Sequence, residues 1–510
     1  MVISDKEKVL GIDLGTSNSA AAVYNFDGTE IIPPKEKNIY GDVFPSYVTF
    51  LENEKILVGQ PAKKRFLSDP KNTIINVKRE MGTDHKIKIH NDEYTPQEIS
   101  ALILKKIKKD AENFLEGEEI KKAVITVPAY FNDLQRTATI DAGAIAGLDV
   151  IRLVNEPTAA SLTYGFDSNS DEMVKIMVYD FGGGTLDITI LNFENGVFDV
   201  KSTNGDTKLG GIDIDEKIRD YAIEEFEIEN NINLRDDDVA VKRVIISAEK
   251  AKIELSDVSK TEIIVDNIAF VDENPVHLIV ELTREKLEEL IKPIVKKSEV
   301  PIKQALDDLN YTPSDIDELI IVGGTTRMPY VQKFVENYIG IPAVSEKKID
   351  PMECVAKGAA LQGAILEGEV EGLVLYDITP YSLGIGIVGN RMDKLIQKNA
   401  GIPLHVTKTF TTVCDYQEAV DTNVLQGENM KASKNKSIGG FSLGGITKAP
   451  AGVPQIDVSF DIDAHGIIRV KTQDQDNSVE GSITIKSHNK LSEEQIIELT
   501  KKIKSKELEN

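Results

Sequence analysis

The chain has 510 residues, of which 41% are hydrophobic and 28% charged, and its formal net charge is −25 at pH 7. At roughly 150 residues per domain, this length predicts about three structural units. The acidic balance argues against nonspecific nucleic-acid binding, which needs a basic surface, and no apolar run approaches the roughly 20 residues of a membrane span. The N-terminus also lacks the charged-then-apolar pattern of a signal peptide, so we expect a cytoplasmic protein without nucleic acid or membrane as a partner.

The first predicted element is a strand that ends at an aspartate and a small, polar turn. The stretch GIDLGTSNSAAAV brings this strand to Asp13 and turns at residues 15–18 before a second apolar run. Further along, Lys121–Tyr130 is rich in apolar and β-branched residues, which predicts a buried strand. Leu134–Gly147 has helical periodicity. Such alternation from Val9 to about Gly368 predicts a layered α/β architecture.

The same acidic turn occurs a second time. The strand Val174–Phe181 reaches Asp180, and the stretch YDFGGGTLDITI then turns at residues 182–185. Helical periodicity follows over Arg284–Leu306. A third glycine turn lies in Leu319–Tyr338, where we expect a strand, a turn at residues 323–324 and a helix that carries Arg327.

The paired turns predict an anion site with a metal. Glycine lets backbone N–H groups approach an anion closely, and an aspartate at each strand end offers the hard oxygen that Mg²⁺ prefers. A single Asp-x-Gly stretch is usually only a turn, but two copies between strands favour two related halves that clamp a polyphosphate. Neither a Rossmann GxGxxG nor a GxxxxGK[ST] P-loop is present. The two cysteines and six histidines show no metal-ligand spacing.

Beyond Gly368 the pattern changes to short strands and turns. Val458–Val470 alternates on both sides of an AHG turn, which predicts a hairpin. Several such strands between Asp377 and Lys486 favour a β-sandwich. The last stretch begins with Ser492 and Gln495 at capping-box spacing, which predicts one short helix with nothing after it in the chain to pack on.

Five N-terminal motifs together resemble those of the seventy-kilodalton heat-shock chaperones of the DnaK type: GIDLGTSNS, VITVPAYFNDLQR, NEPTAASLTYG, YDFGGGTLD and IVGGTTRMP. TPYSLGI, VLQGE and VPQIDVSFDIDAHGI extend the resemblance to nearly the whole chain. It implies an α/β actin-like ATPase domain of two duplicated lobes over residues 1–372, a linker over 373–379, a β-sandwich peptide-binding domain over 380–490 and the start of a truncated helical lid over 491–510. The implied activity is that of an ATP-driven chaperone for extended apolar segments of unfolded proteins.

The resemblance also implies the site residues, the cofactors and the partners. The cofactors would be ATP or ADP and Mg²⁺, with K⁺ as a further candidate, and the partners a J-domain co-chaperone and a GrpE-type nucleotide exchange factor. The catalytic set would be Lys78, Glu156, Asp180, Thr185 and Asp13, with Asp13 and Asp180 holding the metal through water. The nucleotide set would be Gly15, Thr16, Ser17, Asn18, Gly182, Gly183, Gly184, Thr185, Asp187, Gly210, Gly211, Glu249, Lys252, Ser256, Gly323, Gly324 and Arg327. From composition alone, Lys78 would be a surface lysine.

Two further sets follow from the resemblance. The peptide groove would be lined by Ile385, Ile387, Val388, Phe410, Val413, Val420 and Thr422, for which ordinary sandwich core is the alternative. Coupling between the domains would use Pro128, Arg136, Leu373, Leu375 and Asp377. Without the resemblance, Leu373–Tyr376 could be either a strand or a flexible connector.

The chain departs from the family pattern at five positions. Tyr376 stands in the linker where leucine is usual, Met352 replaces an aspartate near the expected ions, and Ile212 replaces a polar residue near the phosphates. Val388 and Val413 change the side chains expected to arch over a peptide. Two rival functions stay open at this point: a small-molecule kinase of the same fold, which would show a sugar-dependent rate, and an actin-like filament protein, which would sediment as a polymer with ATP.

Overall fold

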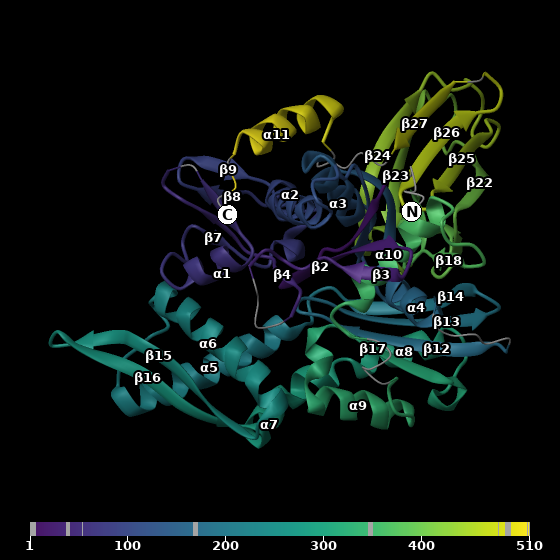
Figure 1. Cartoon of the computed structure of the whole chain (residues 1–510). Helices are drawn as coiled ribbons and strands as arrows, with labels where there is room; N and C mark the ends of the chain where they lie inside the picture. Colours follow the sequence, from purple (N-terminus) through teal and green to yellow (C-terminus); the bar gives the residue numbers. More distant parts are fainter. Residues whose placement is uncertain are drawn as a thin grey trace.

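The computed structural model describes residues 7–36, 41–53, 55–166, 172–344, 350–477, 479–484, 491–506 and 508. A mixed sheet forms the centre of the first lobe (Figure 1). Its strands, in spatial order, are β11 (Asp149–Asn155), β10 (Lys122–Val127), β1 (Val9–Asp13), β2 (Asn18–Asn25) and β3 (Gly28–Ile31), with β4 (Phe44–Pro45) beside β2. β1 is parallel to β10 and antiparallel to β2, so the predicted strand–turn–strand unit is confirmed.

A second sheet repeats this arrangement in the second lobe. Its order is β17 (Glu318–Val322), β12 (Val174–Phe181), β13 (Leu186–Glu194), β14 (Val197–Asp206), β18 (Val374–Ile378) and β21 (Gly401–Ile402). β12 is parallel to β17 and antiparallel to β13, which are the same directions as in the first lobe. The two acidic turns therefore occupy equivalent places in two sheets of like topology.

Helices cover these sheets on both faces. α4 (Glu156–Phe166) and α10 (Cys354–Leu366) lie between the two sheets, where their apolar residues share one core with both (Figure 1). The outer helices of the first lobe are α1 (Gln60–Phe66), α2 (Pro96–Phe114) and α3 (Asp133–Ile145), and those of the second are α5 (Gly211–Asn230), α6 (Asp238–Asp257), α7 (Arg284–Lys296), α8 (Glu299–Asp307) and α9 (Pro329–Ile339). Short strands and turns complete the first lobe: β5 (Val48–Phe50), β6 (Ile56–Val58), β7 (Thr73–Ile74), η1 (Val77–Glu80), β8 (Ile87–Ile89) and β9 (Asp92–Tyr94).

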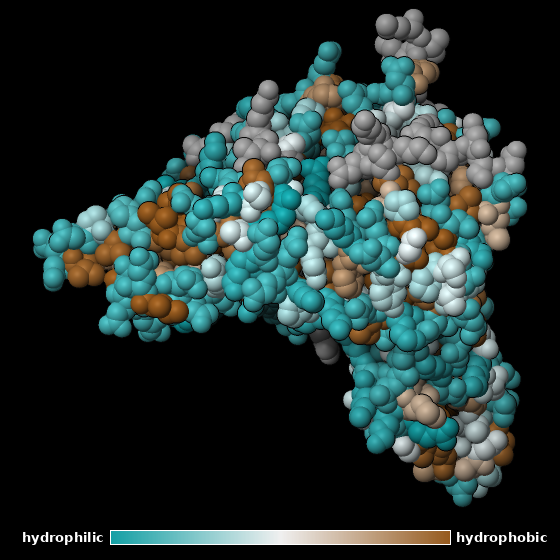
Figure 2. All heavy atoms as spheres, turned by 90° about the horizontal axis from the view of Figure 1, so that it is seen from below, coloured by the Kyte–Doolittle hydropathy of each residue, from teal (hydrophilic) through white to brown (hydrophobic). Residues whose placement is uncertain are grey.

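A hairpin of β15 (Lys260–Val271) and β16 (Asn274–Thr283) projects from the second lobe (Figure 1). Figure 2 shows apolar side chains on the surface of the molecule. Within this hairpin, Ile264, Phe270 and Ile279 are exposed.

Two helix predictions need correction. The expected single helix over Arg284–Leu306 is divided into α7 and α8, since Pro301 has no N–H to donate to the carbonyl of Lys297. Arg327 does not lie in the expected helix. It ends the short 3₁₀ turn η3 (Gly324–Arg327), and α9 begins only at Pro329, a residue favoured at the first helical position.

Two antiparallel sheets follow the second lobe along the chain. One has the order β20 (Arg391–Ile396), β19 (Leu383–Ile387), β23 (Ala419–Gln426) and β24 (Lys436–Gly444); the other has β22 (Leu404–Phe410), β25 (Ile456–Ile462), β26 (Ile468–Asp474) and β27 (Glu480–Thr484). Both contribute apolar residues to one core. The hairpin predicted from Val458–Val470 is confirmed as β25–β26, with Gly466 in its turn at φ 76°.

The capping box at Ser492 is confirmed at the start of α11 (Glu493–Ser505). This helix packs on elements from much earlier in the chain, since it lies against α2 and α3 of the first lobe (Figure 1). Its Ile503 is fully buried there, and Lys502 donates to Glu98 at 2.7 Å. Among the described residues, no helix combines the length and apolarity needed to cross a membrane.

Candidate functional site

The two acidic turns face each other across a cavity of about 560 Å³ between the lobes. Residues 15–18 line it from the first lobe, and Gly182, Gly183 and Thr185 line it from the second. The turns approach so closely that a Cβ on Gly183 would lie 2.5 Å from Ser17 Oγ. A Cβ on Gly184 would lie 2.5 Å from Thr16 Oγ1. Glycine is therefore required at both positions for the turns to meet.

Carboxylates from both lobes converge at the floor of the cavity. Asp13 ends β1, Asp180 lies near the end of β12, and Glu156 begins α4. Burial and the charge of Glu156 raise the pKa of Asp13 to about 7, although Lys78 and the hydroxyl of Thr126 oppose the shift. Burial and the charges of Glu156, Asp187 and Asp13 raise the pKa of Asp180 as well. Burial is the largest cause of both pKa shifts, and the charge of Lys78 offsets it only in part.

Lys78 is the cation that lies among these carboxylates. It belongs to η1, is only 5% exposed, and donates to Glu156 Oε1 at 2.5 Å. The composition-based reading of a solvated surface lysine is thus wrong, since tertiary packing buries this side chain. With three carboxylates around one ammonium group, the cavity floor carries an excess of negative charge.

This donor set fits a Mg²⁺ ion that is bound together with phosphate. Mg²⁺ commonly keeps several waters and takes one or two protein carboxylates plus substrate phosphates. In the part of the chain that the structure describes, no group of three or more His, Cys, Asp or Glu side chains could hold a metal alone. Asp13 and Asp180 would provide the two carboxylates, and Asn18 Oδ1 is buried without a hydrogen-bond partner at the same cavity.

The opposite end of the cavity is lined by the residues expected to contact adenosine. Glu249, Lys252 and Ser256 on α6 lie there with Gly323, Gly324 and Arg327. Glu249 accepts from Lys63 at 2.9 Å, which joins α6 to α1 across the lobes. Lys252 pairs with Asp215 at 2.8 Å. Burial raises the pKa of Asp215 to about 7 in spite of this lysine.

Asp215 was not predicted from the sequence. Its signal would have been its position four residues after Gly211, one helical turn into α5.

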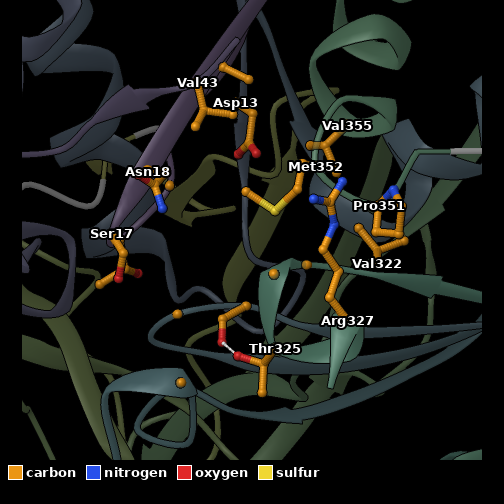
Figure 3. A pocket seen from close by; sticks show the side chains of 18 of the residues that line it. Asp13, Ser17, Asn18, Val43, Val322, Thr325, Arg327, Pro351, Met352 and Val355 are labelled. Carbon is orange, nitrogen blue, oxygen red and sulfur yellow. Dashed lines mark hydrogen bonds between the residues drawn. The ribbon is translucent and has the colours of Figure 1, made fainter. Parts of the chain in front are cut away.

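Figure 3 shows Asp13, Met352 and Arg327 directed toward the same space. Arg327 donates to Asp350 at 3.0 Å, which fixes its guanidinium at the rim of the cavity. Met352 is one of the departures from the family pattern and does line the cavity, with its sulfur 3.2 Å from where a Cβ on Gly324 would be. Ile212, another departure, is buried and does not line it.

Three residues of the expected nucleotide set lie outside the cavity lining: Gly184, Asp187 and Gly210. Asp187 is turned away on β13, where it accepts from the Tyr130 N–H at 3.0 Å. Gly210 packs against the second turn, and a Cβ there would lie 2.4 Å from the Gly183 carbonyl oxygen. These three residues contact the turns or their neighbours and do not reach the cavity, whereas Gly211 lines the cavity.

A chain of buried polar contacts leads from the cavity to the linker. Asn155 precedes Glu156 and donates to both carboxylate oxygens of Asp377, at 2.9 and 2.8 Å. Arg136 is 5% exposed and donates to Asn155 Oδ1 at 2.7 Å. Pro128 lies in the turn between β10 and α3, where its carbonyl accepts from the Phe131 N–H. Asn155 was missed in the sequence, although it stands directly before the predicted Glu156.

The segment expected to form the linker lies as a strand on the second lobe. β18 pairs in parallel with β14, and the Val374 N–H donates to the Gly196 carbonyl at 2.9 Å. Leu373 and Leu375 pack against the core shared by both sheets. Tyr376 is 55% exposed, so this departure from leucine points away from the packed face. The strand reading of Leu373–Tyr376 is confirmed for Val374–Tyr376.

The residues expected in the peptide groove divide into two kinds. Ile385 and Thr422 are buried in the sheet pair, as the alternative reading of ordinary core predicts. Ile387, Phe410 and Val420 are partly buried against apolar core clusters. Val388 and Val413 are 70% and 62% exposed, so they do not belong to the core.

The sheet pair is docked on the first lobe through polar contacts. The Ile468 N–H donates to Asp133 at 3.0 Å, and the Leu153 N–H donates to Nδ1 of His465 at 3.3 Å. Burial lowers the pKa of His465. Asp463 and Asp149 counteract this shift, whereas Arg152 and Arg469 reinforce it. His465 is thus held in the neutral form that can accept this bond.

We expect docking to weaken severalfold as the pH falls below the usual histidine value of 6.5, because protonated Nδ1 cannot accept from Leu153. A depressed pKa means that the neutral form stabilises docking at higher pH and that this contribution is lost on acidification. The extent of docking can be measured from pH 8 to about 5.5 by energy transfer between one dye on the first lobe and one on the sheet pair. His465→Asn keeps an acceptor without titrating, and an equal pH response in that variant would contradict the prediction.

Two sheets of like topology around a cleft with paired acidic turns are consistent with an actin-like ATPase. Residues 9–510 match the family model described as Hsp70 protein. The chain is 58% identical over 495 residues to the "Chaperone protein DnaK" of Methanothermobacter thermautotrophicus, covering 97% of this chain and 82% of that protein. Proteins of the same name from Picrophilus torridus and Thermoplasma acidophilum are 52% and 51% identical, each over 97% of this chain and 80% of the relative.

The chain belongs to the Hsp70 family. Members of this family are ATPases that act as chaperones, and the ATPase activity expected from the sequence is confirmed at the level of the family.

Proposed function

We propose that this chain binds ATP with Mg²⁺ in the cavity between the lobes, and that ATP binding and hydrolysis switch its affinity for extended apolar segments of unfolded proteins. The observation that carries the proposal is the buried contact path from Lys78 and Glu156 through Asn155 to Asp377 of the linker. Binding or loss of the γ-phosphate would change the contacts of Lys78 and Glu156 at one end of this path. The docking of the linker at Asp377, at the other end, would then change in response.

The roles of the cavity residues follow from their placement. Phosphoryl transfer depends mainly on positioning and on charge neutralisation. Lys78 would turn from Glu156 to the γ-phosphate and hold it. Glu156 would then orient the attacking water and accept a hydrogen bond from that water. The backbone N–H groups of the two turns would bind phosphate oxygens. Bound Mg²⁺ would supply positive charge beside Asp13 and Asp180, and K⁺ is a further candidate for the same negative region.

Residues 380–490 would form the β-sandwich peptide-binding domain, residues 373–379 the linker, residues 1–372 the ATPase domain, and residues 491–510 the start of a lid. A groove that offers backbone hydrogen bonds and apolar pockets recognises an extended segment. The exposed Val388 and Val413 would contact such a segment, with Ile387, Phe410 and Val420 behind them. J-domain and GrpE-type proteins are the proposed regulators of the ATPase cycle.

The test of the proposal is the ATP hydrolysis rate with and without an extended, leucine-rich peptide. We expect the peptide to raise the rate, since peptide and ATP favour different domain arrangements and are coupled by roughly 1–3 kcal/mol. A panel of sugars is the matched contrast. A rate that depends on sugar, or one that does not respond to any peptide, would overturn the proposal.

Replacement of Asp377 by asparagine should abolish peptide stimulation and leave the basal rate within about twofold. Asparagine keeps one side-chain oxygen but has an NH₂ group in place of the other, so one of the two hydrogen bonds that the Asn155 amide donates to Asp377 is lost. Loss of this buried bond should weaken linker docking by roughly tenfold. Tyr376→Phe is the matched control, because Tyr376 is exposed on the same strand. Peptide stimulation of normal size in Asp377→Asn would remove Asp377 from the coupling.

A further inference from the structure

One arginine beside the cavity crosses from the first lobe to the second. Arg79 follows Lys78 in η1. Its Nε and Nη2 donate to the Gly184 carbonyl at 3.2 and 3.0 Å, and Nη2 also donates to Asp213 Oδ2 at 2.7 Å. The guanidinium group thus contacts a backbone carbonyl and a carboxylate of the opposite lobe at once, a geometry that its rigid planar fork permits.

Both acceptors of Arg79 belong to the structure that forms the second turn. Gly184 is within the turn itself. Asp213 also accepts from the Gly210 N–H at 2.7 Å and so fixes the start of α5. Gly210 in turn packs on Gly183 so tightly that a Cβ there would lie 2.5 Å from the Gly184 nitrogen. One side chain of the first lobe therefore holds the turn and its support together.

This contact differs from the ion pair of Lys63 with Glu249, which also joins the lobes. That pair lies at the end of the cavity expected to hold adenosine, whereas Arg79 is next to Lys78 at the end expected to hold the phosphates. Because Arg79 can make its three bonds only when the lobes are close together, its contact links lobe closure to the position of the second turn.

We propose that Arg79 is a positioning residue that fixes the second phosphate turn against the first lobe, and thereby slows nucleotide release and aligns the γ-phosphate with Lys78. This inference rests on the proposed function. Arg79 does not line the cavity, so it acts through Gly184 and Asp213 and not on the nucleotide itself. Its side chain is 19% exposed and that of Asp213 29% exposed, so solvent screens this pair only in part.

The experiment compares wild type with Arg79→Met, Arg79→Lys and Asp213→Asn. We would measure dissociation of fluorescent ADP in the presence of Mg²⁺, single-turnover hydrolysis of bound ATP, and the melting temperature without nucleotide. Arg79→Met should raise the dissociation rate about tenfold and slow hydrolysis of bound ATP, because charge-assisted hydrogen bonds are lost. The rates of Arg79→Lys should lie between those of wild type and Arg79→Met, since one ammonium group cannot make all the hydrogen bonds of the planar guanidinium group. Lys71→Met, an exposed change in the same segment, should behave as wild type.

The outcomes distinguish a failure of the proposed nucleotide binding from a failure of the role inferred for Arg79. If wild type fails to bind magnesium–ADP, the proposed function itself fails. If wild type binds and Arg79→Met releases ADP and hydrolyses ATP at the wild-type rates, the inference about Arg79 is overturned. If Arg79→Met melts too early to measure, Arg79→Lys decides, and wild-type rates in that variant overturn the inference. In the double variant Arg79→Met/Asp213→Asn, effects that add fully would show that the two side chains act separately.

Discussion

Replacement of Lys78 by alanine should lower the ATP hydrolysis rate at least about 100-fold and leave magnesium–ATP binding nearly intact. Removing one electrostatic group that acts on developing charge typically costs a factor of this size. Binding should survive because the backbone of two turns and the residues of α6 hold the rest of the nucleotide. Single-turnover hydrolysis and calorimetric titration with ATP would measure the two effects separately.

The matched control for this variant is Lys71→Ala, an exposed lysine of the same segment, which should retain the wild-type rate. The calorimetric titration also shows whether Lys78→Ala is folded, since its loss leaves Glu156 buried without its ammonium partner. Turnover at the wild-type rate in Lys78→Ala would show that this lysine has no part in the reaction.

Simultaneous replacement of Asp13 and Asp180 by asparagine should weaken magnesium–nucleotide binding by about 100-fold or more. Both side chains keep their size but lose the charged oxygens that Mg²⁺ prefers. The affinity measured with and without Mg²⁺ should become nearly equal, because the variant no longer distinguishes the two conditions. Unchanged magnesium-dependent binding would overturn the assignment of these residues to the metal.

The same variant should be more stable than wild type in the absence of nucleotide. Burial raises the pKa of Asp13 to about 7 and raises that of Asp180 too, so the charged carboxylates destabilise the fold above this pH. A raised carboxyl pKa means that stability is lost as the pH rises through it. Asparagine removes that cost, and the melting temperature at pH 8 should therefore rise. A fall in both binding and stability would indicate misfolding and would be resolved with the single variants.

Local patterns in the sequence predicted the elements that carry the site. The two acidic strand–turn–strand units lie where the alternation of apolar and small residues placed them, because glycine and aspartate act within a few residues of chain. The strand Val174–Phe181 has the predicted bounds, and the capping box at Ser492 is formed by neighbouring residues. The helix over Arg284–Leu306 was wrong only where a proline divided it.

The sequence alone does not indicate which side chains that are far apart in the chain come into contact. Lys78 and Glu156 are 78 positions apart, and only tertiary packing buries the lysine against the carboxylate. The same holds for Asn155 with Asp377 and for Arg79 with Asp213, none of which was predicted as a pair. The packing of α11 on the first lobe was not predicted, because its partners α2 and α3 lie far from it in the sequence.

The sequence by itself determined the two glycine turns with their aspartates, the alternation of strands and helices, and the change to short strands after the linker, since each depends on conformational preferences within a few residues. The tertiary structure decided the burial of Lys78, the raised pKa values of the carboxylates and the path from Glu156 to the linker. These properties arise from desolvation and from charges brought together across the lobes, and such energies depend on distances in space that no local pattern contains.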